Sequence, residues 1–223
     1  MRIFGEKALR GADMGATHMQ GVDIILEGSE AGIGTEDSPI VLEVGGELTV
    51  RSEGDLYIKQ VDGDLAISAV YAAGDAVISS EYDIFSPKHD LGYVNVHGDL
   101  TLNAGGDIGT KELGLWVLAG GRSVNATADN IYIDAQAEKG IADSALTLGD
   151  LTARGNDITI TSDGDITTIG TITAAERNDD EYAIYLQSEK TITLAGGTVE
   201  ADSVGLWAAE AVVQSAQQTI DSE

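Results

Sequence analysis

Apolar and polar residues alternate in short segments along most of the chain. "LTV" from Leu48, "LYI" from Leu56 and "LAI" from Leu65 each place apolar side chains at every second position. This period of two predicts half-buried β-strands. Segments of the same kind begin at Val22, Ala76, Leu100, Ile131, Leu146, Ile158, Ala183 and Thr191. The pattern predicts many short strands and few long amphipathic helices.

The spacing of these segments predicts how the strands are arranged. Strand centres lie about 9 to 11 residues apart, so two or three strands with their turns make a coil of about 20 to 30 residues. Stacked coils bury a continuous axial core of Ile, Leu, Val and Ala. The predicted fold is all-β, a single-stranded parallel β-helix, in which Ile58 and Ile133 point inward.

A Gly-Asp step precedes many of the predicted strands. Because equivalent corners of stacked coils lie about 5 Å apart, the aspartates of these steps are expected to share corner columns. Their carboxylates can accept N–H groups of the turns, which offsets part of their mutual repulsion without an ion. These aspartates are Asp55, Asp64, Asp75, Asp99, Asp107, Asp150 and Asp165.

A long repeat divides the chain. "AGIGTEDSPIVLEVGG" at 31–46 returns 75 positions later as "GDIGTKELGLWVLAGG" at 106–121, and its glycines predict a corner of the coil with Ile33 inward and Thr35 outward. We expect one β-helix without a linker. Residues 1–21 are expected to be a partly irregular or cloning-derived segment, and residues 208–223 a terminal strand or frayed tail. The β-helix is expected over 22–207. It contains repeats at about 23–97 and 98–173, of three or four coils each, and a looser third repeat.

The order of motifs in these repeats resembles that of filamentous-haemagglutinin-type bacterial adhesins. In that family an Ile-Gly-Thr turn leads through a proline into a strand and then through Gly-Asp-Leu steps, as in "IGTEDSPIVLEV" and "GDLYI" here. The resemblance covers about residues 22–174, and the second copy departs from it at Gly114, where the family has proline. It implies a right-handed β-helical stalk exported to the cell surface, with adhesion implied by kinship alone.

Charge and composition narrow the function classes. Twelve basic residues against 38 acidic ones give a net charge of −26, which repels nucleic acid and anionic membrane surfaces. The absence of cysteine excludes disulfides and thiolate metal sites. No run approaches the roughly 20 apolar residues of a spanning helix, and the N-terminus lacks a secretory signal, so we expect an internal fragment.

Two loops hold the groups that a carbohydrate-active β-helix enzyme would need. Such enzymes gather carboxylates and basic residues on one exposed face. The solvated-loop interpretation is favoured for both sets, because charged residues in acidic loops are ordinarily solvated. The candidates are Asp83, Lys88, His89 and Asp90 in the first loop and Arg177, Asp179, Asp180 and Glu181 in the second.

Other candidate binding groups are isolated. His18, His89 and His97 are scattered, and "SDGD" at 162–165 lacks the spacing of an EF-hand or a calcium-binding β-roll. Trp116 and Trp207 each follow Gly-Leu; capping or filling the core is favoured over a sugar-stacking platform. The sequence therefore predicts no catalytic, cofactor-binding or metal-binding residues and no cofactor.

These observations favour a non-catalytic structural or adhesive stalk segment of a large secreted or cell-surface bacterial protein. The alternatives are a carbohydrate-active β-helix enzyme, either a polysaccharide lyase or a glycoside hydrolase, and a phage or viral fibre segment. The expected partners are neighbouring coils of a longer chain, a second copy through end-to-end association, and a host or cell-surface ligand bound by another region. Neither nucleic-acid binding nor membrane insertion is expected.

Overall fold

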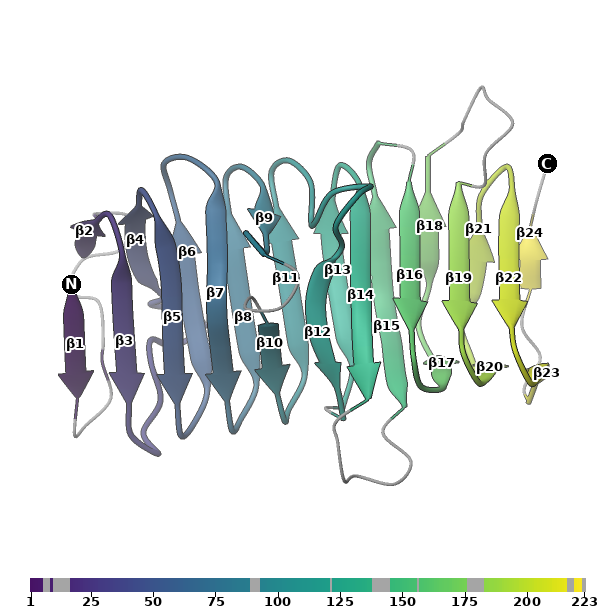
Figure 1. The fold of residues 1–223 in the computed structure, drawn as a ribbon, viewed down its shortest axis with the longest axis horizontal. Coiled ribbons are helices and arrows are strands. Elements are labelled where there is room, and N and C mark those ends of the chain that lie inside the picture. Colours follow the sequence, from purple (N-terminus) through teal and green to yellow (C-terminus); the bar gives the residue numbers. More distant parts are fainter. Residues whose placement is uncertain are drawn as a thin grey trace.

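The computed structural model is a β-solenoid of about 8 turns, built from two stacked parallel sheets (Figure 1). It describes residues 1–5, 9, 17–88, 93–120, 122–137, 145–155, 157–175, 183–215 and 219–221. Across these ranges every named element is a strand, and every pairing between named strands is parallel, which confirms the predicted all-β parallel β-helix. The same residues contain no helix long and apolar enough to cross a membrane.

Successive strands alternate between two sheets, which we call sheet A and sheet B. Sheet A contains β1 (Arg2–Gly5), β3 (Ile24–Gly28), β5 (Glu47–Ser52), β7 (Leu65–Ala72), β9 (Ile84–Phe85), β10 (Tyr93–Val96), β12 (Leu115–Ala119), β14 (Ile131–Ala137), β16 (Ile158–Ser162), β19 (Ile184–Ser188) and β22 (Val204–Ala208). Sheet B contains β2 (Met19–Gly21), β4 (Ile40–Val44), β6 (Leu56–Gln60), β8 (Ala76–Ser80), β11 (Leu100–Ala104), β13 (Val124–Ala128), β15 (Leu146–Ala153), β17 (Ile166–Thr168), β18 (Ile172–Ala174), β20 (Thr191–Leu194), β21 (Thr198–Glu200), β23 (Ala211–Gln214) and β24 (Thr219–Asp221).

The coil is right-handed. In Figure 1 the strands of the nearer sheet A run downward, those of the more distant sheet B run upward, and the chain advances from left to right. The same hand is nearly universal for crossovers between parallel strands, because it follows from the right-handed twist of the strands themselves.

The core consists of inward rows that continue from coil to coil. Ile131, Ile158 and Ile184 form one such row in sheet A, since the register pairs them in consecutive strands. Ile58 and Ile133 are each 1% exposed, which confirms that both point inward. The core cluster contains only Ile, Leu, Val and Ala among the described residues. Branched aliphatic side chains stack in register along the axis, so each coil buries its inward face only against its neighbours.

The Ile-Gly-Thr motif is an outward loop inside a strand, so the prediction of a corner is wrong for Gly34. It is confirmed for Gly32, in the turn after β3, and for Gly45 and Gly46, between β4 and β5. Ile33 bridges to Leu56 and Ile40 pairs with Ile58, so both isoleucines take inward positions of one strand line in sheet B. The intervening residues 34–39 leave the sheet where a single outward residue would stand, opposite Tyr57. Inward placement of Ile33, which is fully buried, is confirmed.

The second copy repeats this loop on the opposite sheet. Ile108 bridges to Ile131 and Leu115 pairs with Ile133, which places residues 109–114 opposite Tyr132 in sheet A. The first copy leads into β4 and the second into β12, seven strands later when β9 and β10 are counted as one interrupted strand. An odd number of strands is a half-integral number of coils. The repeat therefore spans three and a half coils and exchanges the two sheets.

Strands also extend beyond the expected limits of the β-helix at 22 and 207. β1 pairs with β3 and β2 pairs with β4, so residues 2–5 and 19–21 belong to the first coil. β23 pairs with β20 and β24 with β21, which continues sheet B past residue 208.

Candidate functional site

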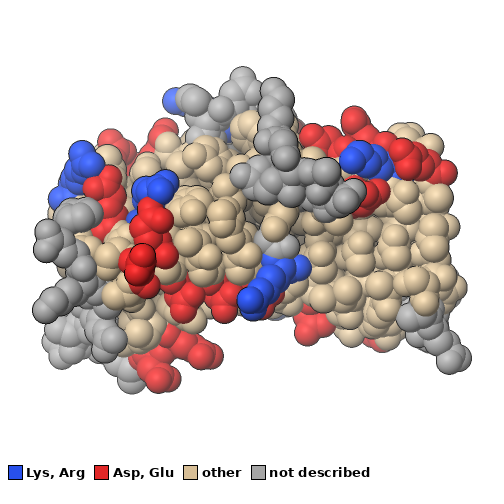
Figure 2. Space-filling model, turned by 90° about the horizontal axis from the view of Figure 1, so that it is seen from below, with Lys and Arg blue, Asp and Glu red and all other residues tan. Residues whose placement is uncertain are grey.

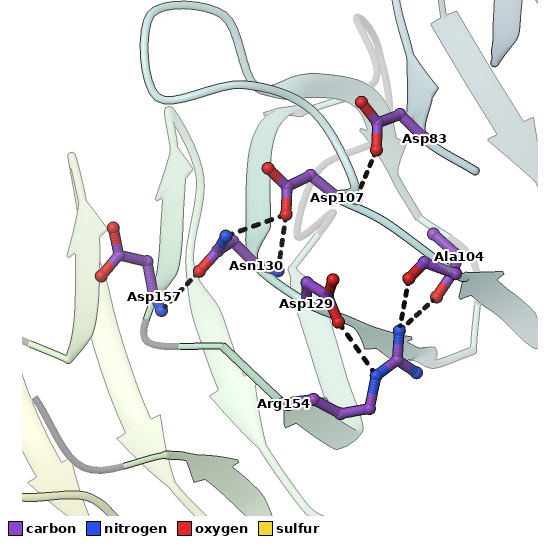
Figure 3. Close-up of polar contacts among 8 residues, drawn as sticks. Asp83, Ala104, Asp107, Asp129, Asn130, Arg154 and Asp157 are labelled. Atoms are coloured by element: carbon purple, nitrogen blue, oxygen red, sulfur yellow. Dashed lines mark hydrogen bonds and ion pairs between the residues drawn. The ribbon is translucent and has the colours of Figure 1, made fainter.

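Aspartate and asparagine side chains link consecutive coils at the corner where sheet B passes into sheet A. Each stands directly before a strand of sheet A and accepts the backbone N–H of the equivalent residue in the next coil (Figure 3). Asp83 Oδ1 accepts the Asp107 N–H at 2.7 Å, Asp107 Oδ1 accepts the Asn130 N–H at 3.0 Å, and Asn130 Oδ1 accepts the Asp157 N–H at 3.1 Å. The N–H of Asp83 itself donates to Asp64 Oδ1 at 3.3 Å. We call this series the upper ladder.

A second series, the lower ladder, occupies the corner where sheet A passes into sheet B. Asp55 Oδ1 accepts the Asp75 N–H at 2.9 Å, and Asp75 Oδ1 accepts the Asp99 N–H at 2.9 Å. Asp99 Oδ1 then accepts the Ser123 hydroxyl at 2.8 Å. Figure 2 views the molecule from below, the side of this corner, where acidic side chains outnumber basic ones. The expected corner columns are therefore two, one at each corner, and most of their carboxylates accept turn N–H groups as predicted. The prediction is wrong for Asp150, which lies inside β15 rather than at a corner.

The ladders explain why glycine stands before many of these aspartates. A Cβ built on Gly106 would collide with the Asp83 carboxylate of the preceding coil, and one on Gly74 would collide with Asp55. Neither glycine has a positive φ, so conformational freedom is not the reason for glycine at these two positions. The Gly-Asp step is thus a matched pair: the glycine admits the aspartate of the coil before, and the aspartate extends over the coil after.

Arg154 adds contacts between coils at the corner where sheet B passes into sheet A (Figure 3). Its Nε donates to Asp129 Oδ1 at 3.1 Å, and its Nη2 donates to the backbone oxygens of Ala104 and Gly105 at 2.8 and 3.0 Å. Asp129 follows β13 and Ala104 ends β11, so one guanidinium joins residues of three successive coils of sheet B.

Two of the side chains considered for catalysis lie within the described residues. Asp83 belongs to the upper ladder, and Lys88 is exposed on the loop that interrupts β9 and β10. His89 and Asp90 lie outside the described residues. The same holds for the whole second set, Arg177, Asp179, Asp180 and Glu181. The structure therefore describes two of the eight candidates, Asp83 and Lys88, and these two lie in different surroundings.

The histidines and the "SDGD" turn have structural partners. His18 Nδ1 accepts the Val41 N–H at 2.9 Å, and the His97 ring packs edge-on against Tyr71 with centroids 5.3 Å apart. In the turn, Asp165 Oδ1 accepts the Thr191 N–H at 3.0 Å. His89 lies outside the described residues. Within the described ranges no three His, Cys, Asp or Glu side chains cluster in a way that could hold a metal ion.

Tyr57 lies beneath the outward loop at 34–39. Burial, followed by the nearby carboxylates of Asp55, Asp75 and Glu36, raises the pKa of its phenol above the ordinary value of 10.0. Tyr57, Lys59 and Pro39 help to line a hollow of about 130 Å³, below the roughly 300 Å³ at which ligand pockets begin. A neutral phenol in a small hollow is suited to packing the loop against the sheet.

Both tryptophans face outward, so the prediction that they cap or fill the core is wrong. Trp116 stands between the buried residues Leu115 and Val117, and Trp207 is 48% exposed. The register pairs Trp116 with Asp134, Asp134 with Thr161, Thr161 with Gln187, and Gln187 with Trp207. The two Gly-Leu-Trp segments thus occupy one outward row of sheet A, four coils apart. We call these five residues the tryptophan row.

Aromatic residues as a class gather on the outer face of sheet A. The sequence holds two Trp, seven Tyr and two Phe, and seven of these eleven occupy outward positions of this one sheet. They are Tyr71, Phe85, Tyr93, Trp116, Tyr132, Tyr185 and Trp207. On sheet B only Tyr57 takes such a position among the described residues. Because the core cluster has no aromatic side chain, the asymmetry belongs to the surface.

The comparisons with known proteins add no relative. No protein-family model matches the chain, and neither a curated protein nor a solved structure matches it. Sequence reasoning missed the aromatic face of sheet A because consecutive aromatic residues are 8 to 53 positions apart, and only the strand register unites them.

Proposed function

We propose that this chain is a non-catalytic structural and adhesive stalk segment of a large bacterial protein that is secreted or held at the cell surface. Its mechanism is to hold binding surfaces away from the cell on a stiff rod. The observation that carries the proposal is the pair of corner ladders, which fasten consecutive coils to one another from Asp64 to Asp157 at one corner and from Asp55 to Ser123 at the other. The resemblance to the filamentous-haemagglutinin repeats supports the same function.

A rod needs resistance to bending along its whole length. The aliphatic rows supply it inside, because side chains at native packing density leave little freedom for one coil to shift against another. The ladders supply it at the corners, where turns of a solenoid would otherwise be held by backbone pairing alone. About 8 coils at about 4.8 Å per coil give a segment about 40 Å long.

Labelling of intact cells tests this proposal. Cells that make the protein are treated with an antibody raised against this chain, before and after permeabilisation, with a cytosolic protein as control. We expect full labelling of the intact cells. Labelling that requires permeabilisation would contradict the proposal.

The enzymatic alternative is tested with the purified chain. Incubation with pectin, alginate, xylan and laminarin should release no new reducing ends and no unsaturated uronates. Release by the parent chain would contradict a non-catalytic role, and loss of that release in Asp83→Asn would place the activity at the corner that precedes β9.

A further inference from the structure

We infer that the outer face of sheet A between Trp116 and Trp207 binds a neutral polysaccharide that lies along the solenoid axis. The inference deepens the adhesive part of the proposed function and rests on it. Two parallel rows form the surface: the tryptophan row, and beside it Thr159 and Tyr185, which the register pairs in consecutive coils. Tyr132 precedes Thr159 in the same register but is only 8% exposed, opposite the outward loop at 109–114.

The aromatic side chains on this face have no role in the core. Trp207 is 48% exposed, and Tyr185 is partly exposed, although an outward position in a strand can be filled by a threonine at lower cost. Tyr and Trp rings offer a flat apolar surface together with a polar edge. The apolar face of a pyranose ring stacks on such a surface, while its hydroxyls extend sideways to hydrogen-bonding neighbours.

The polar side chains beside the rings are already oriented. The Tyr185 hydroxyl donates to Gln187 Oε1 at 3.1 Å, and the Thr161 hydroxyl donates to Asp134 Oδ1. Gln187 Nε2 has no hydrogen bond to another described residue, so its two N–H donors point to solvent groups. Hydroxyl, amide and carboxylate groups thus alternate with aromatic rings, which is the mixture that a sugar hydroxyl pattern requires.

Charge selects among polysaccharides. Asp134 is the one charged side chain at an outward position on the described parts of β12, β14, β16, β19 and β22, apart from the strand ends. No basic residue stands there to pair with a sulfate or carboxylate, and the net charge of −26 repels polyanions. Protein–protein interfaces are enriched in arginine, and these strands contain no arginine, so a protein partner is less favoured than a polysaccharide.

The geometry favours an extended ligand. Equivalent positions on consecutive coils are about 4.8 Å apart, and the four steps from Trp116 to Trp207 span about 19 Å. One sugar residue of an extended chain advances by a similar distance, so successive residues can meet successive coils.

Affinity electrophoresis of the intact chain tests the inference. Native gels contain laminarin, mannan, xylan or arabinogalactan as neutral probes, and alginate or heparin as polyanionic probes. We expect at least one neutral probe to retard the chain. Trp207→Ala and Tyr185→Ala should each weaken that retardation at least tenfold in apparent Kd. Tyr82→Ala is the matched control, because Tyr82 is also 48% exposed but lies at a corner, and it should bind as the parent does.

Stability is measured alongside binding. Gln187→Met keeps the size of the side chain and removes its amide, so it tests the face even if an aromatic variant fails to fold; we expect it to weaken binding at least threefold with an unchanged melting temperature. Retardation by no neutral probe, by polyanions alone, or equally in all variants would overturn the inference. Such a result would leave the surface labelling of intact cells unchanged, so failure here is distinct from failure of the stalk proposal.

Discussion

The Gly-Asp step makes a quantitative prediction through Asp83 and Gly106. Asp83→Ala removes the bond that its carboxylate accepts from the Asp107 N–H at 2.7 Å. Hydrogen bonds to charged groups contribute about 1.5 to 3 kcal/mol. The substitution also removes repulsion from the carboxylates of Asp64 and Asp107, about 0.8 kcal/mol for each pair at about 5 Å in water. We expect a net loss of about 1 kcal/mol in the free energy of unfolding.

Gly106→Ala should cost more than Asp83→Ala, and the cost should depend on Asp83. The nearest atoms to a Cβ at Gly106 all belong to Asp83, and the carboxylate oxygen is the one that collides. Overpacking of this kind costs about 1 to 3 kcal/mol. In the double variant the colliding oxygen is absent. Its loss in the free energy of unfolding should therefore be smaller than the sum of the two single-variant losses by at least about 1 kcal/mol.

Urea denaturation followed by far-UV circular dichroism measures the four free energies of this cycle. Gly63→Ala is the control, because Gly63 has φ +68° and open space around its Cβ position. Its cost is conformational, so it should add to that of Asp83→Ala. Asp83→Asn keeps the acceptor, as Asn130 does naturally, and should be as stable as the parent. Additive costs for Gly106→Ala and Asp83→Ala would refute the matched-pair explanation.

Three further predictions follow from the core, the phenol and the carboxylates. Ile133→Asp should abolish cooperative folding, because it buries an unpaired charge at a cost of several kcal/mol; a melting temperature within a few degrees of the parent would show that the side chain is not inward. Because the pKa of Tyr57 is raised in the folded state, its phenol contributes stability below pH 10 that is lost as the pH rises through the pKa of the folded state. Tyr57→Phe should therefore flatten the fall in melting temperature above pH 10. An unchanged pH profile would count against burial of the Tyr57 phenol as the cause. Millimolar CaCl₂ should raise the melting temperature no more than NaCl at matched ionic strength, since the ladder carboxylates accept N–H groups; a calcium-specific gain above about 5 °C, reversed by chelator, would disprove this.

Local alternation was sufficient to predict the strands and the inward side chains. In "DLYI" at 55–58 and "NIYI" at 130–133, the apolar residues on either side of tyrosine are buried as expected. The aspartate columns were predictable in part, because a turn glycine followed by an aspartate marks several corners, whereas Asp83, Asn130 and Asp157 follow no glycine. These features depend on residues close together in sequence.

Features that depend on the register between coils were not predictable. Thr147, Thr167 and Thr193 form one outward row on sheet B, yet they are 20 and then 26 residues apart. The coils differ in length because their loops differ, so equal spacing in space is unequal in sequence. For the same reason the 75-residue repeat gave no sign that its copies lie on opposite sheets.

The corner interpretation of the Ile-Gly-Thr motif failed for a related reason. Gly34 and Gly109 both have φ +69°, which is typical of a turn, and sequence does not distinguish a turn between strands from a loop inside one. The distinction depends on Ile40 and Leu115, which return to the strand line beside Ile58 and Ile133. Outward placement of the tryptophans likewise depends on the strand register around Gly-Leu-Trp.

Native-state hydrogen exchange at the corners tests the central claim most directly, because the stalk proposal depends on ladders that fasten consecutive coils to one another. The measured quantity is the protection of the backbone N–H groups of Asp75, Asp99, Asp107 and Asn130, each donated to a side chain of the preceding coil. We predict protection close to that of the adjoining strands, and loss of protection at Asp107 in Asp83→Ala alone. Corner N–H groups that exchange at the unprotected rate while the strands stay protected would contradict the account, because the coils would then be joined by their sheets only.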